Sequence, residues 1–340
     1  MRPTGPLLLI TVLQGVSGGL VLSVAALWWL MPADRWLLPM GLWGAFVIAS
    51  VGGVASLFHM HKPKAGRFIL RRLKTSWLSR EALTTGIYVP VLAILVIVPH
   101  LLLVAPFWYG IGSVIASGLA LIAMYVTAML YATIPAMRSW HTPLTVVSMM
   151  WVGLVAGTAL TEARIAIAIG GHPGGPLHLA LLGGTVILAG IKWLQYRYFS
   201  EARQAIHAST GTGMPAAPYR LIDSGTTKLP YRTQTQVWPS LELGRRAVLY
   251  MVMGLSLILV PFVLEVLPMG PRAIEWASAA GIMVCGAFIE RWIFFADVTH
   301  SSKIWFGDEL QRPSSVSSNR VSPDFARRLK QVGMHRHDGL

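Results

Sequence analysis

The chain has 340 residues, of which 54% are hydrophobic and 12% are charged, and its net charge is +14. A soluble domain carries about 25% charged residues, so a chain this poor in charge cannot cover an ordinary water-facing surface. The composition therefore excludes a soluble globular protein and predicts a polytopic membrane protein.

Long uncharged runs account for the low charge. A helix of about 20 residues spans the hydrocarbon core, and these runs lack the alternation that is typical of barrel strands. The longest run must hold two spans, separated by a turn at "IVPHLLLVAPFWYG". The runs without Asp, Glu, Lys or Arg are Leu7–Ala33, Leu37–Phe58, Ala82–Met137, Ser139–Thr161, Ile165–Ile191 and Ala247–Leu264.

These runs predict an all-α bundle of eight transmembrane helices. The first run is too long for a signal peptide and lacks a clear cleavage site, so we expect it to be retained. We expect a membrane domain over residues 1–300, with a polar loop at 198–245, and then a polar tail at 301–340. The expected helices are 7–31, 37–59, 82–103, 107–131, 143–166, 177–197, 246–267 and 273–296.

Eight spans place both termini on one side of the membrane, which we call side A. Side A then receives 25 of the 28 lysines and arginines, whereas the opposite side B receives Arg35, Arg164 and Arg272. Basic residues concentrate on the cytoplasmic side of membrane proteins. We therefore expect both termini, the polar loop and the tail to be cytoplasmic.

The most basic segment, "HMHKPKAGRFILRRLKTSWLSR" (59–80), lies at side A. Topology and anionic lipid headgroups account for most of its charge. Nucleic acid is excluded as a partner because no aromatic-interleaved platform or known binding motif accompanies the basic residues. The single cysteine, Cys285, excludes disulfides and cysteine-ligated iron–sulfur clusters within this chain.

Four groups of polar residues are not explained by topology, and the predicted spans place all four at side A. Ionisable residues inside a membrane boundary are a functional hypothesis by default. Glu290 and Arg291 are adjacent in sequence and cannot face each other on a helix, so we expect each to have a partner elsewhere. The four groups are His59 with His61, Ser79 with Glu81, Arg138 with His141, and Glu290 with Arg291.

Helix capping and contact with the membrane surface can also explain these residues, without any binding site. Ser79 is a good N-cap for the third helix, which would place Glu81 in the first turn, where the helix dipole favours a carboxylate. His59 can extend to the lipid headgroups. An interfacial aromatic belt explains the tryptophans at this depth, which are Trp77, Trp140 and Trp292.

A quinone site is the functional alternative. Such a site needs a hydrogen-bond partner for a quinone oxygen and a proton acceptor near the aqueous edge. His59 or His61, together with Glu81, can fill these two roles. No metal site is expected. A haem would need two histidines on facing helices, and His100 and His178 each stand in a Pro- or Gly-rich turn, so no haem is expected either.

The sequence resembles the membrane anchor subunits of the dimethyl sulfoxide reductase family, a group that includes the anchor of membrane-bound sulfite dehydrogenase. The resemblance covers most of the chain and rests on "SLFHMHKP", "RF", "LSREAL", "MLYATIPAMRSWHTPL" and "ERWIFFADVTH". It implies an eight-helix, quinone-binding anchor in a bacterial inner membrane. Its implied partners are membrane lipid, a molybdopterin catalytic subunit and a four-cluster iron–sulfur subunit.

The resemblance also implies site residues. The family ties the histidine of "LFH" and the glutamate after "LSR" to quinone binding, and these are His59 and Glu81 here. The additional His61 leaves open which histidine meets the menaquinone or ubiquinone. Further quinone contacts are expected from Arg67 and Ser79, with possible second contacts from Arg138, His141, Glu290 and Arg291.

The predicted function is therefore passage of electrons between the quinone pool and an iron–sulfur partner, with sulfite oxidation favoured. The chain itself is expected to contain no catalytic residue, because the substrate chemistry belongs to another subunit. The alternatives are the anchor of a dimethyl sulfoxide or related S- or N-oxide reductase, an anchor without a quinone site, and a small-solute transporter. A transporter would place polar groups at mid-depth, whereas the ionisable residues are expected to gather at one face.

Overall fold

The computed structural model describes residues 4–31, 37–59, 68, 71–102, 106–170, 175–204, 243–267 and 271–298. Within these ranges the regular structure is entirely helical. Most of the predicted polar loop and the whole predicted tail lie outside the described residues, and so do His61 and Arg67.

Eight helical spans in the described residues are long and apolar enough to cross a membrane, which confirms the predicted fold. The seventh span is interrupted by a π-helical turn just before Pro261, which cannot donate a backbone hydrogen bond. The helices are α1 (Gly5–Leu30), α2 (Leu37–His59), α3 (Trp77–Leu102), α4 (Pro106–Ala132), α5 (Pro143–Ile169), α6 (Gly175–Gln204), α9 (Leu243–Gly254), η3 (Leu255–Leu259), α10 (Val260–Val266) and α11 (Arg272–Ala296).

Two predicted helix ends are wrong by several residues. Helix α3 begins at Trp77 rather than at residue 82, and α6 continues to Gln204 rather than ending at 197. The extension of α6 is supported by an exposed pair between Arg197 and Glu201, with Nε and Oε1 3.3 Å apart. The predicted ends lie next to the first charged residues, but a helix can continue beyond the membrane surface into water.

Helix α5 is bounded by signals that are visible in its sequence. The Thr142 hydroxyl accepts the backbone N–H of Leu144 at 3.4 Å, and Pro143 occupies the first helical position. The helix ends at Gly170, whose φ of 63° is the left-handed conformation that glycine adopts readily.

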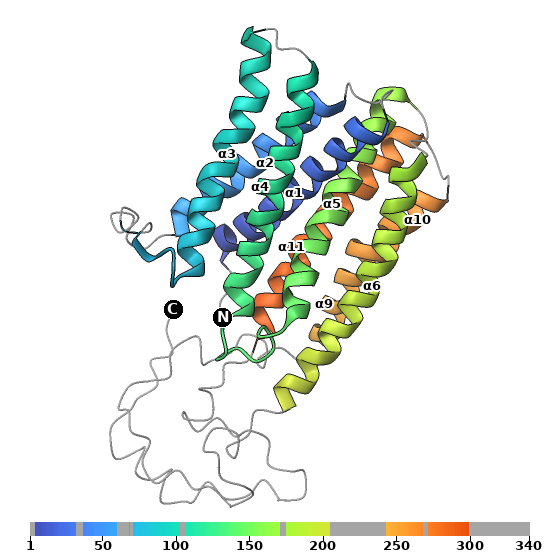
Figure 1. The fold of residues 1–340 in the computed structure, drawn as a ribbon. Helices are drawn as coiled ribbons and strands as arrows, with labels where there is room; N and C mark the ends of the chain where they lie inside the picture. The colour runs from blue at the N-terminus through green and yellow to red at the C-terminus, as the bar shows by residue number, and fades with distance from the viewer. Residues whose placement is uncertain are drawn as a thin grey trace, which may run out of the picture.

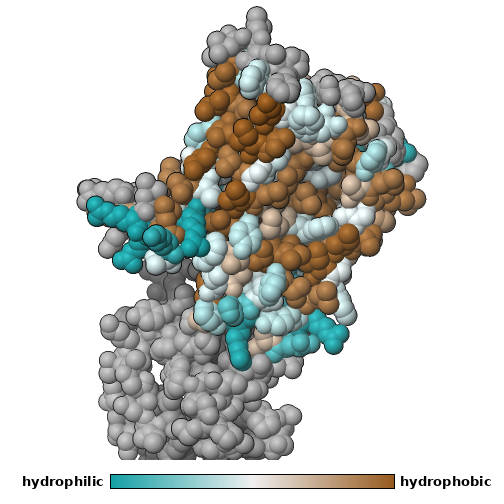
Figure 2. Space-filling model, in the orientation of Figure 1, coloured by the Kyte–Doolittle hydropathy of each residue, from teal (hydrophilic) through white to brown (hydrophobic). Residues whose placement is uncertain are grey.

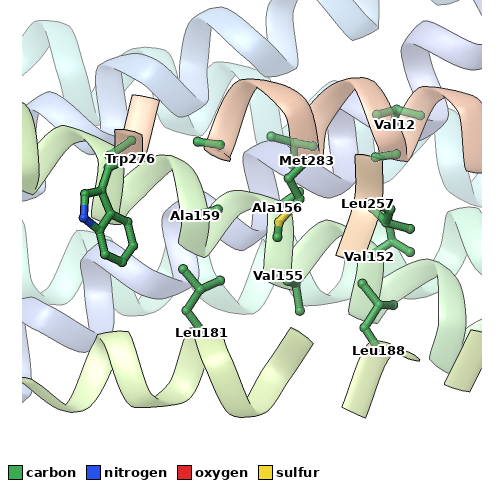
Figure 3. Close-up of a cluster of buried hydrophobic side chains, with 14 of the residues drawn as sticks. Val12, Val152, Val155, Ala156, Ala159, Leu181, Leu188, Leu257, Trp276 and Met283 are labelled. Carbon is green, nitrogen blue, oxygen red and sulfur yellow. The ribbon is translucent and has the colours of Figure 1, made fainter. Parts of the chain in front are cut away.

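Helices α1 and α5 form the centre of the bundle. Helix α1 packs against α2, α4, α5 and α11, and α5 also packs against α6 and α11. Figure 1 shows α3 and α4 on one flank, with α6, α9 and α10 on the other. Figure 3 shows apolar side chains that α1, α5, η3 and α11 bring together, including Val12, Ala156, Leu257 and Met283.

Glycines allow α1 and α5 to approach each other closely. A Cβ on Gly19 would overlap the carbonyl group of Gly153, and a Cβ on Gly157 would overlap the backbone of Gly19. Small residues let helix backbones come together in a membrane, where van der Waals packing replaces the hydrophobic effect. The hydroxyls of Ser23 and Thr161 add a hydrogen bond of 2.9 Å between the same helices.

The outer surface of the bundle is apolar. Figure 2 shows hydrophobic side chains along the sides, whereas hydrophilic side chains gather toward the end where α3 begins and α6 ends. Exposed apolar residues include Val47, Ile94, Ile122 and Leu179. An apolar surface of this extent indicates contact with lipid.

Candidate functional site

Glu81 lies in the second turn of α3, near side A. The Ser76 hydroxyl accepts the backbone N–H of Ser79 at 3.3 Å, so Ser76 is the N-cap and the interpretation of Ser79 as the cap is wrong. The first turn of α3 contains no acidic residue. Because the effect of the helix dipole fades within the first turn, the dipole does not explain the position of Glu81.

The carboxylate of Glu81 faces α4. Its Oε1 accepts a hydrogen bond of 2.8 Å from the hydroxyl of Thr127, and the residue is partly buried. Trp77 lies one turn before Glu81, on the same side of α3, and its ring contacts that of Tyr125 with the centroids 6.2 Å apart. The site therefore combines a carboxylate with aromatic surface at the lipid boundary.

The neighbouring cation, Arg80, is turned away from Glu81. Its Nε and Nη2 donate to the carbonyls of Leu73 and Lys74, each at 2.8 Å, and its guanidinium lies 4.2 Å from the centre of the Trp77 ring. Among the described residues, Glu81 forms no ion pair. Its carboxylate is thus held by a neutral donor.

The histidines remain predictions. His59 is the last residue of α2, but its side chain lies outside the described residues, as do His61 and Arg67. The structure therefore does not test which histidine accompanies Glu81.

Arg138 and His141 lie between α4 and α5 at side A, and both are exposed. His141 Nδ1 is 2.8 Å from the carbonyl oxygen of Ala132. Trp140, in contrast, is fully buried, and its indole N–H donates to the carbonyl of Phe294 at 3.1 Å. The aromatic-belt interpretation is therefore wrong for Trp140, which instead ties this connection to α11.

Glu290 lies in a buried ion cluster between α5, α6 and α11. The ammonium group of Lys192 donates to Glu290 Oε1 at 2.5 Å, to the Ser148 hydroxyl at 2.5 Å and to Gln195 Oε1 at 3.0 Å. All three donors of Lys192 are thus used. Glu290 has the partner on another helix that the sequence predicts.

The prediction for Arg291 is wrong. Its Nη2 lies 3.4 Å from Oε2 of Glu290, its neighbour in sequence, because the long side chain can turn back along α11. The guanidinium also lies 5.2 Å from the centre of the Phe294 ring. Lys192, Glu290 and Arg291 are all buried, so two basic side chains share the one carboxylate of Glu290.

Tyr131 of α4 lies between Glu81 and this ion cluster. On one side it follows Thr127, the hydrogen-bond partner of Glu81, by one turn of α4. On the other side it is buried against Trp140, Phe294 and Phe295, and the Phe294 ring also contacts the Arg291 guanidinium. The structure therefore places Glu81 and the ion cluster near one another, at a similar depth.

Ionisable residues also occur at side B, so the prediction that they gather at one face is wrong. Glu162, Glu265 and Glu275 are buried in the last turns of α5, at the end of α10 and in the first turn of α11. Arg272 pairs with Glu275 at 3.5 Å. The two sets lie toward opposite ends of the bundle, unlike the mid-depth site that a transporter would need.

The two histidines considered for haem are on helices rather than in turns. His100 lies near the end of α3, and His178 lies in the first turn of α6. The His178 ring contacts Trp276 with the ring centroids 5.1 Å apart.

Sequence reasoning missed Lys192 and Thr127. Lys192 lies inside the predicted span 177–197, and its charge is a visible signal, but topology alone offers a sufficient explanation of that charge. Thr127 stands in a long uncharged run, and nothing in the sequence distinguishes it from other threonines.

The fold and this site define a multi-span membrane protein with polar side chains grouped at its side-A boundary. Residues 2–198 match the family model described as DMSO reductase anchor subunit (DmsC), which covers more than half of the chain. The chain belongs to this family and is a membrane anchor subunit of a molybdopterin oxidoreductase. Family membership implies association with catalytic and iron–sulfur subunits.

A curated relative extends this similarity beyond residue 198, to 90% of the chain. The chain is 27% identical over 337 residues to the C subunit of sulfite dehydrogenase from Allochromatium vinosum, with 90% of this chain and 99% of that protein covered. No solved structure matches the chain significantly.

Proposed function

We propose that this anchor passes electrons between the quinone pool and its iron–sulfur partner, and that Glu81 exchanges protons with the quinone. The observation that supports this proposal is the carboxylate of Glu81, partly buried at the boundary between α3 and α4 and hydrogen bonded to Thr127 at 2.8 Å. A carboxylate that has no ionic partner among the described residues can gain and lose a proton without breaking an ion pair.

The surroundings of Glu81 suit a lipid-soluble quinone. Tyr125 is 43% exposed and Leu78 is 60% exposed, so the surface near Trp77 and Glu81 is open toward the bilayer. A menaquinone or ubiquinone supplies two-electron, two-proton chemistry when bound. Glu81 would hold one proton at the side-A edge, and His59 or His61 would hydrogen bond to a quinone oxygen.

We propose that the complex oxidises sulfite and delivers electrons to quinone. This direction is supported by the similarity to a sulfite dehydrogenase subunit along almost the entire length of that protein. The family description, DMSO reductase anchor subunit, favours a second candidate, in which the anchor draws electrons from quinol for a reductase.

Membranes that contain the complex should reduce quinone when sulfite is added, and membranes from a strain without this anchor should not. The reason is that electrons released in a partner subunit reach the quinone only through the anchored assembly. The measurement is sulfite-dependent reduction of a short-chain ubiquinone analogue. Quinol oxidation that depends on dimethyl sulfoxide, without any sulfite activity, would reverse the proposed direction.

We propose that the protein lies in the bacterial inner membrane with side A in the cytoplasm. Reporter fusions after Thr210 and at the C-terminus should then give a cytoplasmic signal, and a fusion after Ala33 should not. The cations at side A, including Arg71, Arg72 and Arg138, would face the iron–sulfur subunit there, and Arg67 is a further candidate contact. An extracytoplasmic signal at Thr210 would contradict both the orientation and this docking face.

A further inference from the structure

A small pocket lies next to the Glu81–Thr127 hydrogen bond, between α1, α4 and α5. Its volume of about 10 Å³ is close to the minimum that one water molecule needs. The residues that line it are Thr11, Gln14, Gly15, Met124, Thr127 and Met149.

Gln14 supplies a polar group that needs a partner in this pocket. The residue is 3% exposed, and its Oε1 accepts a hydrogen bond of 3.0 Å from the hydroxyl of Thr85. Its Nε2 is buried and has no hydrogen-bond partner among the residues that the structure describes. If the amide turned over, its oxygen would need a partner instead, so the pocket has an unmet polar group either way.

Two threonine hydroxyls can complete the coordination of a water molecule. The Thr11 hydroxyl donates to the carbonyl of Leu7 at 2.8 Å, and the Thr127 hydroxyl donates to Glu81 at 2.8 Å. Each has therefore used its hydrogen, and each oxygen can still accept one. A water molecule that accepts from Gln14 and donates to both threonines has three partners, which is typical of buried water.

We propose that this pocket binds one water molecule, which links Gln14 through Thr127 to Glu81 and fixes the orientation of the Glu81 carboxyl. The hydrogen bonds run in one direction, from Gln14 Nε2 to the water, from the water to Thr127 Oγ1, and from Thr127 to Glu81 Oε1. Gln14 and Thr127 are positioning residues, because they act on Glu81 rather than on the quinone.

This arrangement gives the two oxygens of Glu81 different tasks. Oε1 accepts from Thr127 whether the carboxyl is ionised or protonated, so the exchangeable proton resides on Oε2. Among the described residues, no hydrogen bond reaches Oε2. The inference that this orientation matters for turnover rests on the proposed function of Glu81; the water site itself does not.

The test uses Thr127→Val and Gln14→Met in the complete purified complex. Thr127→Val keeps the shape but removes the hydroxyl, and Gln14→Met removes the donor to the water. Thr127→Val should lower kcat with a short-chain ubiquinone analogue roughly 10-fold, as expected for a lost hydrogen bond to a charged group. Gln14→Met should lower kcat about 5-fold, because the hydrogen bond that it removes is to a neutral water molecule. KM for the analogue and turnover with ferricyanide should stay unchanged.

Three further variants separate the loss of this chain of hydrogen bonds from a general packing effect. Thr127→Ser keeps the hydroxyl and should retain most of the quinone turnover. Thr185→Val is the matched control, because Thr185 is a buried threonine of α6 whose hydroxyl donates to the carbonyl of Leu181, away from the pocket. The double variant Thr127→Val with Gln14→Met should be no slower than Thr127→Val alone, because both changes break one chain.

Several outcomes would overturn the water site. Normal turnover in Gln14→Met beside a slow Thr127→Val would show that Thr127 acts without a water. Normal turnover in both, with Glu81→Gln inactive, would remove this inference and leave the proposed function; an active Glu81→Gln would remove the proposed function instead. A density map of the wild-type complex that shows other buried waters but none between Gln14 and Thr127 would also overturn it, even if the variants fail to assemble.

Discussion

Glu81→Gln should lower turnover with quinone roughly 10²-fold or more, as expected when a general acid–base group is lost. The amide keeps the size of the side chain, and its oxygen can still accept the hydrogen bond from Thr127. It cannot take up a proton at neutral pH, so the effect isolates proton exchange. The measurement is kcat of the purified complex with a short-chain ubiquinone analogue.

Turnover of the same complex with ferricyanide should stay unchanged, because a soluble acceptor bypasses the membrane site. Glu201→Gln is the matched control, since Glu201 is an exposed carboxylate near the end of α6. His59→Ala and His61→Ala, assayed in the same way, would identify the histidine of the site. Normal quinone turnover in Glu81→Gln, with the complex assembled, would contradict the assignment of Glu81.

Glu290→Leu should destabilise the protein by roughly 3–5 kcal/mol, the usual cost of leaving a buried charge without its partner. Glu290 pairs with both Lys192 and Arg291, and its removal leaves these two buried cations without their shared carboxylate. The measurement is thermal unfolding of the detergent-solubilised complex. We expect a clearly lower Tm and a lower yield of the purified complex.

The matched control for this prediction is Glu201→Leu. That change also breaks a carboxylate–cation pair, but both partners are 64% exposed. Exposed pairs contribute about 0–1 kcal/mol, so the control should unfold close to the wild-type temperature. Equal Tm values for the two variants would show that the buried cluster does not stabilise the bundle.

The sequence predicts the eight spans well because bilayer thickness and backbone hydrogen bonding leave few alternatives. It predicts helix ends less well, because a helix end depends on its cap. Ser76 and Ser79 are both plausible caps by composition, and the difference between them decides whether Glu81 lies in the first turn. The hydrogen bond from the Ser79 backbone N–H to the Ser76 hydroxyl shows that Ser76 caps α3.

The site is predictable only in part, for a different physical reason. A charged residue such as Glu81 or Glu290 is visible in an apolar sequence because its burial is costly. Its neutral partners are not visible, because Thr127, Ser148 and Gln195 are ordinary residues until the helices bring them together. Adjacent residues on a helix do not face each other, so the sequence predicts no ion pair between Glu290 and Arg291. The arginine side chain is nevertheless long enough to reach the Glu290 carboxylate.

The glycine contact between α1 and α5 has a consequence for how the chain is made. Helix α1 leaves the ribosome first, but the surface that it presents to Gly153 and Gly157 has no partner until α5 follows. At the usual 5–20 residues per second, the delay is on the order of ten seconds. During that interval α1 can pair with α2 and α4 but must keep its glycine face open to lipid or to the insertion machinery. The centre of the bundle is therefore completed late, and a chain cut short before α5 would reach the membrane with its first helix lacking the neighbour against which its backbone is shaped.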